Sequence, residues 1–226
     1  MRKLGILVAV VLLGMAGLAA SDVLILGTID RIDELSFANS YDHFTWHILR
    51  NTTQALLTLE PGSAKLLPSI AESWEISEGG KAYIFHIRPG ITFWDNTPCD
   101  AHAVEWSLKR SIRLNGPKGG VHLISDYIED VVALDDLTVK ITLKKPDPTG
   151  IFLLFMTDQI APSLIYSPKS TPEDEFANGR YAGTGPYKLV DYAPDEYVVL
   201  EAYDGFFGEP PKTKRIVWRT TYSSGA

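Results

Sequence analysis

Two histidines early in the chain have the spacing of a metal site. His43 and His47 lie four residues apart, so on a helix they would share one face, as paired zinc ligands do. A zinc enzyme of the H-E-x-x-H type also needs a carboxylate in register with the two histidines, and none is present. We therefore expect these histidines to be core or capping residues, and we predict no bound metal.

Other residues that could carry catalysis fall where ordinary structural roles are favoured. Asp135 and Asp136 could act as an acid–base pair, but they occupy the expected turn of a hairpin, where aspartate is common for backbone reasons. The single cysteine, Cys99, has no obvious histidine partner, and no G-x-S-x-G motif occurs. A secreted hydrolase is therefore the less favoured alternative, and we predict no enzymatic activity and no cofactor.

The clearest strand signal lies at residues 82–88. Tyr83, Phe85 and Ile87 alternate with more polar residues, which predicts a half-buried strand. Gly79-Gly80 before this segment and Pro89-Gly90 after it predict turns at both of its ends.

A helix is expected to begin after Asp100, which suits an N-cap. An apolar stripe recurs every four residues and consists of Val104, Leu108 and Ile112. Charged residues expected to point away from this stripe are Glu105, Lys109 and Arg110.

Further elements are expected along the rest of the chain. Strands are predicted at 23–28, in a buried position, and at 215–219; helices at 43–57 and 151–156; and hairpins at 131–143 and 187–201. Paired glycines and a proline predict a mobile loop at 114–122.

The first twenty residues have the layout of a secretory signal peptide. Arg2 and Lys3 precede an apolar run at 4–13 that is too short to span a bilayer, and small residues follow at 14–20. No cysteine lies near the expected cleavage site, so a lipid anchor is not predicted. The mature protein is expected to be exported, either periplasmic or extracellular, and to lie at the outer face of the cytoplasmic membrane.

Composition narrows the classes of partner. The formal charge is −7 and becomes −9 when the two basic residues of the signal peptide are lost, which argues against nucleic acid and anionic membranes as partners. A lone cysteine cannot form an internal disulfide, so an exported chain of this kind must rely on its core. A hydrophobic content of 45% over 226 residues is enough for one sizeable core or two small ones.

Three ordered motifs then point to a known family. P-x-I-A-E-S-W-E-I-S begins at Pro68, Y-x-F-x-I-R-P-G-I-x-F-W-D at Tyr83, and T-P-x-D-A-x-x-V-x-W-S-L-x-R at Thr97. Together they resemble the signature of the family 5 extracellular solute-binding proteins, the peptide, dipeptide and nickel-binding receptors of ABC importers. K-K-P-D-P-T at 144–149 and G-T-G-P-Y-K-L at 183–189 extend the resemblance.

The resemblance implies a mixed α/β fold of the type II periplasmic-binding-protein kind. On this basis we expect a first lobe made of residues 21–55 and 182–226, with an inserted smaller domain at 56–181. In the family, a loop before the first helix lines the ligand cleft. The corresponding residues here are Asn39, Ser40, Tyr41, Asp42 and His43. Their amide, hydroxyl and carboxylate groups could recognise the polar ends of a peptide, whereas a solvated loop with helix-cap residues is the alternative.

The resemblance covers almost all of this chain but only the N-terminal part of the family, so the second lobe is expected to be absent. Because family members enclose their ligand between two lobes, we predict weak or no binding by this chain alone. The predicted function is that of a substrate-binding component of an ABC transporter. It would bind peptides or a similar small solute for import by ABC permease subunits, either as a truncated product or with a second polypeptide that supplies the missing lobe. A non-binding remnant is the alternative, and oligopeptide, dipeptide, nickel complex and sugar all remain open as solutes.

Overall fold

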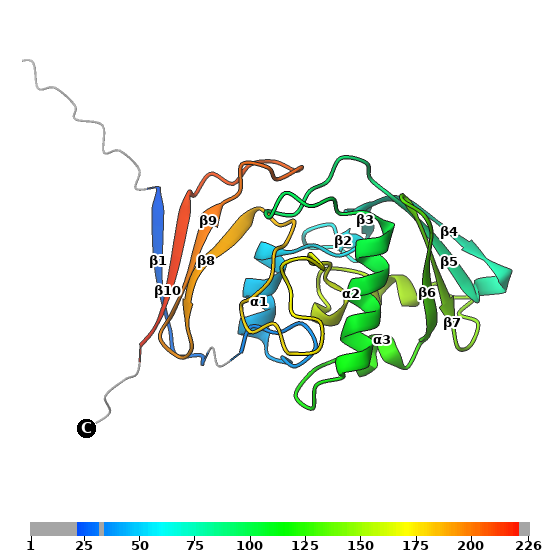
Figure 1. Ribbon diagram of the computed structural model, residues 1–226, viewed down its shortest axis with the longest axis horizontal. Coiled ribbons are helices and arrows are strands. Elements are labelled where there is room, and N and C mark those ends of the chain that lie inside the picture. The colour runs from blue at the N-terminus through cyan, green and yellow to red at the C-terminus, as the bar shows by residue number, and fades with distance from the viewer. Residues whose placement is uncertain (1–21, 32–33, 222–226) are drawn as a thin grey trace, which may run out of the picture.

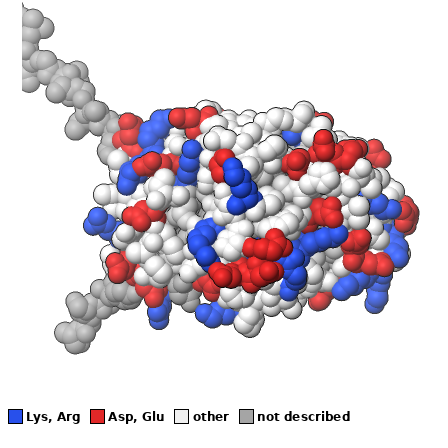
Figure 2. Space-filling model, viewed as in Figure 1, with Lys and Arg blue, Asp and Glu red and all other residues white. Residues whose placement is uncertain are grey.

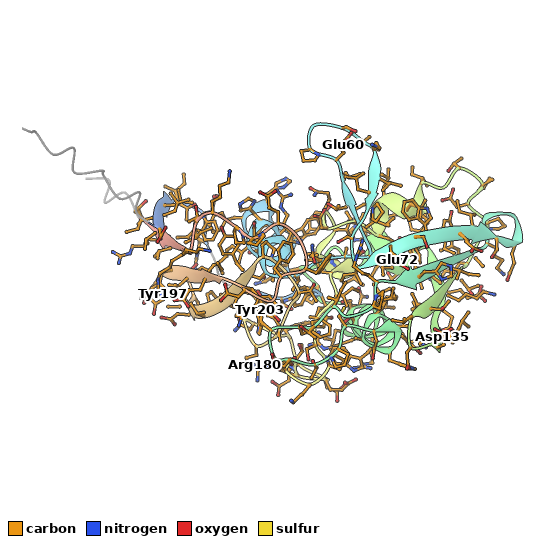
Figure 3. All side chains as sticks on the ribbon, turned by 90° about the horizontal axis from the view of Figure 1, so that it is seen from above. Glu60, Glu72, Asp135, Arg180, Tyr197 and Tyr203 are labelled. Carbon is orange, nitrogen blue, oxygen red and sulfur yellow. The ribbon has the colours of Figure 1, made fainter. Side chains whose placement is uncertain are left out.

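The computed structural model describes residues 22–31 and 34–221, so the signal-peptide prediction for 1–20 lies outside the described residues. A four-stranded sheet lies at each end of the molecule, and the helices lie between the two sheets (Figure 1). This mixed arrangement of strands and helices agrees with the predicted α/β class. Tyr197 on one sheet and Asp135 on the other lie toward opposite ends of the molecule (Figure 3).

The first sheet brings together strands from both ends of the described chain. In spatial order it contains β1 (Val23–Thr28), β10 (Arg215–Thr220), β9 (Tyr197–Ala202) and β8 (Tyr187–Ala193). β1 pairs in parallel with β10, whereas the other pairs are antiparallel. The predicted final strand and last hairpin are thereby confirmed.

β1 forms where it was predicted, but its expected burial was wrong. Val23, Leu24 and Ile25 are 40%, 42% and 64% exposed. The reason is tertiary, because among the strands of residues 22–31 and 34–221 β1 lies at the edge of the sheet and pairs with β10 alone. A short β-branched run has the same sequence pattern at an edge as at a centre.

The second sheet contains the predicted strand at 82–88. Its spatial order is β4 (Ala71–Ser77), β5 (Ala82–Ile87), β7 (Thr138–Leu143) and β6 (Ile128–Asp135), with every pair antiparallel. Tyr83, Phe85 and Ile87 are buried, as their alternation predicted. β6 and β7 form the predicted hairpin around the turn at 135–138.

The first helix is shorter than predicted. α1 (His43–Thr52) ends five residues before the expected end at 57. The hydroxyl groups of Thr52 and Thr53 donate to the carbonyl of Leu49, and such side-chain bonds compete with the continuing helix. The chain then enters β2 (Leu57–Leu59), which pairs with β3 (Leu66–Pro68). The connection between these two strands, which carries Glu60, projects from the body of the molecule (Figure 3).

The second long helix confirms its sequence signals. α2 (Ala101–Leu114) begins after Asp100, whose carboxylate accepts a hydrogen bond from the backbone N–H of Ala103 at 2.9 Å. It ends at Asn115, which adopts a left-handed conformation with φ of 37°. The buried residues of α2 pack over β6 and β7.

One residue of α2 contradicts the sequence prediction. Arg110 was expected to point into solvent, but its side chain is 0% exposed. Its guanidinium donates to the carbonyls of Pro172 and Glu175 at 2.7 and 2.5 Å and to the hydroxyl of Tyr166 at 3.1 Å. The chain at 166–175 covers this side of α2, and no local pattern in the helix could reveal that cover.

Short helical segments complete the described chain. α3 (His122–Ser125) follows α2, and α4 (Phe152–Phe155) is a shorter form of the helix predicted at 151–156. Two 3₁₀ turns, η1 (Glu78–Gly80) and η2 (Ala161–Ser163), lie in connections. Among the residues described, no helix is long and apolar enough to cross a membrane.

Two hydrophobic clusters form the interior. The first lies between α2 and the sheet containing β5, with Phe85 and Leu108 among its fully buried members. The second lies between α1 and the sheet containing β9, with Leu49 and Leu200 among its members. Trp94 packs against both clusters. The division into a first lobe and an inserted domain stays a prediction.

Candidate functional site

All five residues that the sequence predicted as ligand contacts line one hollow between β1 and α1. Asn39, Ser40, Tyr41, Asp42 and His43 share this hollow, which has a volume of about 640 Å³. Sequence reasoning missed four further lining residues, Asp30, Arg31, Phe44 and Lys118. The polar pair at 30–31 lies in the loop that follows β1, and a charged loop after a strand is a signal that could have found it. Lys118 comes from a distant loop, so no local signal could place it here.

Two of the five residues are buried and braced within the protein. Asn39 is 5% exposed, its amide donates to the carboxylate of Glu34 at 2.7 Å, and its Oδ1 accepts from the backbone N–H of Lys118 at 3.1 Å. Ser40 is also 5% exposed, and its hydroxyl donates to the carbonyl of Glu34 at 2.9 Å. These contacts shape the loop at 36–42 and give Asn39 and Ser40 a supporting role in the hollow.

Asp42 caps the helix that follows. Its Oδ1 accepts a hydrogen bond from the backbone N–H of Thr45 at 2.7 Å, which satisfies one of the open donors in the first turn of α1. The helix-cap alternative weighed for this loop is therefore correct for Asp42. Contact between a solute and any of the five residues stays a prediction.

Tyr41 supplies the exposed aromatic ring of the hollow. Its side chain is 58% exposed. The ring meets that of Trp46 edge to face, with centroids 5.1 Å apart and planes at 88°. His43, which begins α1, is exposed on the same rim. Tyr41 and His43 are thus the predicted residues that a solute could reach most directly.

Charges of both signs line the hollow. The lining contains two carboxylates, of Asp30 and Asp42, and two cations, of Arg31 and Lys118. Arg31 also pairs with Asp195 at the turn between β8 and β9, with a shortest N–O distance of 2.5 Å. This ion pair links the loop after β1 to the turn between β8 and β9 of the same sheet. Elsewhere on the surface acidic and basic side chains are likewise interspersed (Figure 2).

The second histidine of the i, i+4 pair faces a different part of the surface. His47 lines a separate hollow with Arg50 and the connection between β2 and β3. Its ring lies against Trp218, and partial burial, followed by the positive charge of Arg50, lowers the pKa of His47. Within residues 22–31 and 34–221, no three His, Cys, Asp or Glu side chains gather as a metal site would require.

Two side chains outside the hollow, Asp95 and Cys99, have pKa values that their surroundings shift. Asp95 accepts hydrogen bonds from the hydroxyls of Ser167 and Ser170 at 2.6 and 2.5 Å. Burial alone raises the pKa of Asp95, but these bonds and those from Thr97 outweigh it and hold that pKa below the ordinary value. Burial strongly raises the pKa of the Cys99 thiol, so this cysteine is not an activated nucleophile.

Comparison with known proteins gives the family of this chain. The family described as "Bacterial extracellular solute-binding proteins, family 5 Middle" matches residues 65–226. The chain therefore belongs to this family, as its sequence motifs predicted. Its members are solute-binding proteins and not enzymes.

Individual relatives support the same placement. The glutathione-binding protein GsiB of Shigella boydii is 31% identical over 218 residues, which cover 94% of this chain and 40% of that protein. The dipeptide-binding protein of Escherichia coli is 28% identical over 188 residues, which cover 74% of this chain and 34% of that protein.

The fold also matches part of a solved periplasmic-binding-protein structure. The ABC transporter-associated periplasmic binding protein DppA from Helicobacter pylori, in complex with the peptide STSA, aligns with a TM-score of 0.75 and 25% identity. The alignment covers 88% of this chain and 42% of that protein. This chain thus spans about two fifths or less of the length of these three relatives.

Proposed function

We propose that this chain belongs to the substrate-binding component of an ABC importer and that it binds a peptide or a similar small solute in the hollow between β1 and α1. The observation that carries this proposal is the lining, which contains two carboxylates, two cations and the exposed ring of Tyr41. A peptide with free ends carries a positive amino group and a negative carboxylate, which match the carboxylates and the cations of the lining. An apolar side chain of the peptide matches the ring of Tyr41.

The three relatives described above support a peptidic solute. One is named for glutathione, one for dipeptides, and one was solved with a tetrapeptide. In the proposed role the protein lies outside the cytoplasmic membrane, in the periplasm or the extracellular space. There it delivers its solute to the permease subunits of the importer.

Binding by this chain alone is expected to be weak. Tyr41, Asp42 and His43 are exposed, so a solute in the hollow is contacted from one side and keeps much of its surface in water. Ligand sites of high affinity bury most of the ligand surface. We therefore expect a Kd on the order of 1 mM for a small peptide.

Calorimetric titration tests this proposal. The chain is titrated with three separate probes, the dipeptide Ala-Ala, glutathione and the tetrapeptide Ser-Thr-Ser-Ala. We expect saturable heat from at least one probe and a matching rise in melting temperature, because a ligand of the native state stabilises it. No response to any of the three would overturn the proposal and favour a non-binding chain.

A matched pair of histidine variants localises the binding. His43 is the first residue of α1 and lines the hollow, whereas His102 is the second residue of α2 and lies outside it. Both side chains are exposed. We expect His43→Ala to raise the Kd of the bound probe several-fold and His102→Ala to leave it unchanged. Equal effects of the two substitutions would place the binding elsewhere.

A further inference from the structure

We propose that Gly120 and Trp46 fix the orientation of the Tyr41 ring, and that this fixed ring makes Tyr41 the residue that selects an apolar side chain of the solute. The first part concerns the protein alone. The second part rests on the proposed function.

Gly120 leaves room for the Tyr41 ring because glycine has no side chain. A Cβ atom built on Gly120 would lie 2.6 and 2.7 Å from Cδ2 and Cε2 of Tyr41 and 3.2 Å from Cζ2 of Trp46. The φ of Gly120 lies outside the left-handed region, so the backbone itself does not require glycine. Space for the aromatic ring is therefore the property that glycine supplies at this position.

Trp46 contacts the Tyr41 ring edge to face and is itself fixed. Its indole N–H donates to the carbonyl of Ser40 at 2.7 Å, so the residue before Tyr41 anchors the ring that Tyr41 contacts. The ring of His122, at the start of α3, lies 6.0 Å from that of Tyr41. Tyr41 is thus packed from several sides while 58% of it stays exposed toward the hollow.

The loop at 116–120 is locked onto the loop that carries Tyr41. The backbone N–H of Gly116 donates to the carbonyl of Ala38 at 2.9 Å, and that of Lys118 donates to Asn39 at 3.1 Å. At Gly119 a Cβ atom would lie 2.1 Å from the Ala38 carbonyl oxygen. The two backbones therefore touch, and the position of Gly120 under the Tyr41 ring is set by contacts outside the ring.

An aromatic ring held in this way favours one kind of contact. Its exposed face is a flat apolar surface, and because its orientation is fixed before binding, little conformational freedom is lost when a side chain packs on it. We expect the hollow to prefer the dipeptide Phe-Ala to Ala-Ala for this reason.

The ring orientation is tested without any solute. In Gly120→Ala the new methyl group displaces the exposed Tyr41 ring and makes a tight contact with Trp46. We expect the fold to survive, because the atoms closer than 3.0 Å belong to the Tyr41 side chain, which can turn toward solvent. In chain carrying ¹³C-labelled tyrosine, the Tyr41 ring signal is assigned with Tyr41→Phe. We expect Gly120→Ala to shift this signal, and an unshifted signal would overturn the positioning role.

Gly208 provides a matched control. A Cβ atom there would lie 2.6 and 2.7 Å from the ring of Phe206, which is the same kind of clash away from the hollow. We expect Gly208→Ala to leave the Tyr41 signal and all binding unchanged. A Tyr41 shift as large as that of Gly120→Ala would show that the effect is not local.

A double-mutant cycle tests the selectivity. The ratio of the Kd for Ala-Ala to that for Phe-Ala should fall about 3- to 10-fold in Gly120→Ala and in Tyr41→Ala. In the Tyr41→Ala background, Gly120→Ala should have no further effect on this ratio. An unchanged ratio in Gly120→Ala would overturn the selective role. If the wild type binds neither dipeptide, the selective role fails together with peptide binding in this hollow, and the ring signal still decides the positioning role.

Discussion

Replacing Arg110 with methionine tests whether a buried guanidinium holds the segment at 172–175 against α2. Methionine keeps much of the side-chain volume, so the change removes mainly the charge and the donors. The contacts at risk are the bonds to the carbonyls of Pro172 and Glu175 and to the Tyr166 hydroxyl. The guanidinium also lies over the ring of Trp106, at 5.6 Å from its centroid.

The expected loss follows from these contacts. Hydrogen bonds from a charged donor contribute about 1.5–3 kcal/mol each, so the three bonds set an upper limit near 9 kcal/mol. Water can reach the carbonyls at 172 and 175 once the segment loosens, and the cost of burying the Arg110 charge disappears. We therefore expect the free energy of unfolding to fall by about 3–4 kcal/mol, which lowers the melting temperature by roughly 10 °C in a domain of this size.

Urea unfolding and amide hydrogen exchange measure the two parts of this effect. The free energy of unfolding comes from the urea midpoint, and faster exchange should be confined to amides at 173–176. Arg113→Met is the control, because its side chain is 48% exposed and its ion pair with Glu173 is screened by water. A loss below about 1 kcal/mol in Arg110→Met, or equal losses in the two variants, would refute the reasoning.

Three further predictions concern the interior. Asp95→Asn should destabilise the chain most above pH 5, where Asp95 is ionised in the wild type. The hydrogen bonds that lower the pKa of Asp95 stabilise its ionised form, so the difference in stability between Asp95→Asn and wild type should shrink as the pH falls below the ordinary pKa of 3.8. Urea midpoints measured across this pH range test the prediction. Gly183→Ala should cost about 1–3 kcal/mol in the same assay, because its Cβ would lie 2.0 Å from the Thr52 carbonyl oxygen. Cys99 should resist a thiol reagent at pH 8 in the native chain and react at once in denaturant.

Each of these three has a clear opposite result. A difference between Asp95→Asn and wild type that does not depend on pH would mean that ionisation of Asp95 adds no stability. A Gly183→Ala variant as stable as wild type would show that the contact with Thr52 relaxes freely. Rapid labelling of native Cys99 would mean that the helix start at α2 opens on the time scale of the reagent.

Local patterns in the sequence predicted the elements whose signals lie close together along the chain. The alternation of Tyr83, Phe85 and Ile87 identified β5 and its buried face. The cap at Asp100 and its apolar stripe identified α2 to within a residue at its start. These predictions succeed because the atoms that decide them, neighbouring side chains and backbone donors within one turn, are also neighbours in sequence.

Predictions failed where distant segments decide the outcome. α1 stops at Thr52, where threonine hydroxyls bond back to the helix and Gln54 pairs with Ile165. Arg110 is buried because a segment some sixty positions further on supplies its hydrogen-bond acceptors. The threonines at the end of α1 are visible in the sequence, but the two helix sequences hold no trace of Ile165 or of the distant acceptors around Arg110.

The site divides in the same way. The sequence by itself determined the family, through motifs at 68–110, and with it the loop at 39–43 that lines the hollow. Only the tertiary structure brought Lys118 to that loop and placed Gly120 beneath the ring of Tyr41. A motif specifies which residues are present, but the packing of a ring against a backbone depends on a contact between loops that are far apart in the chain, and such contacts exist only after folding.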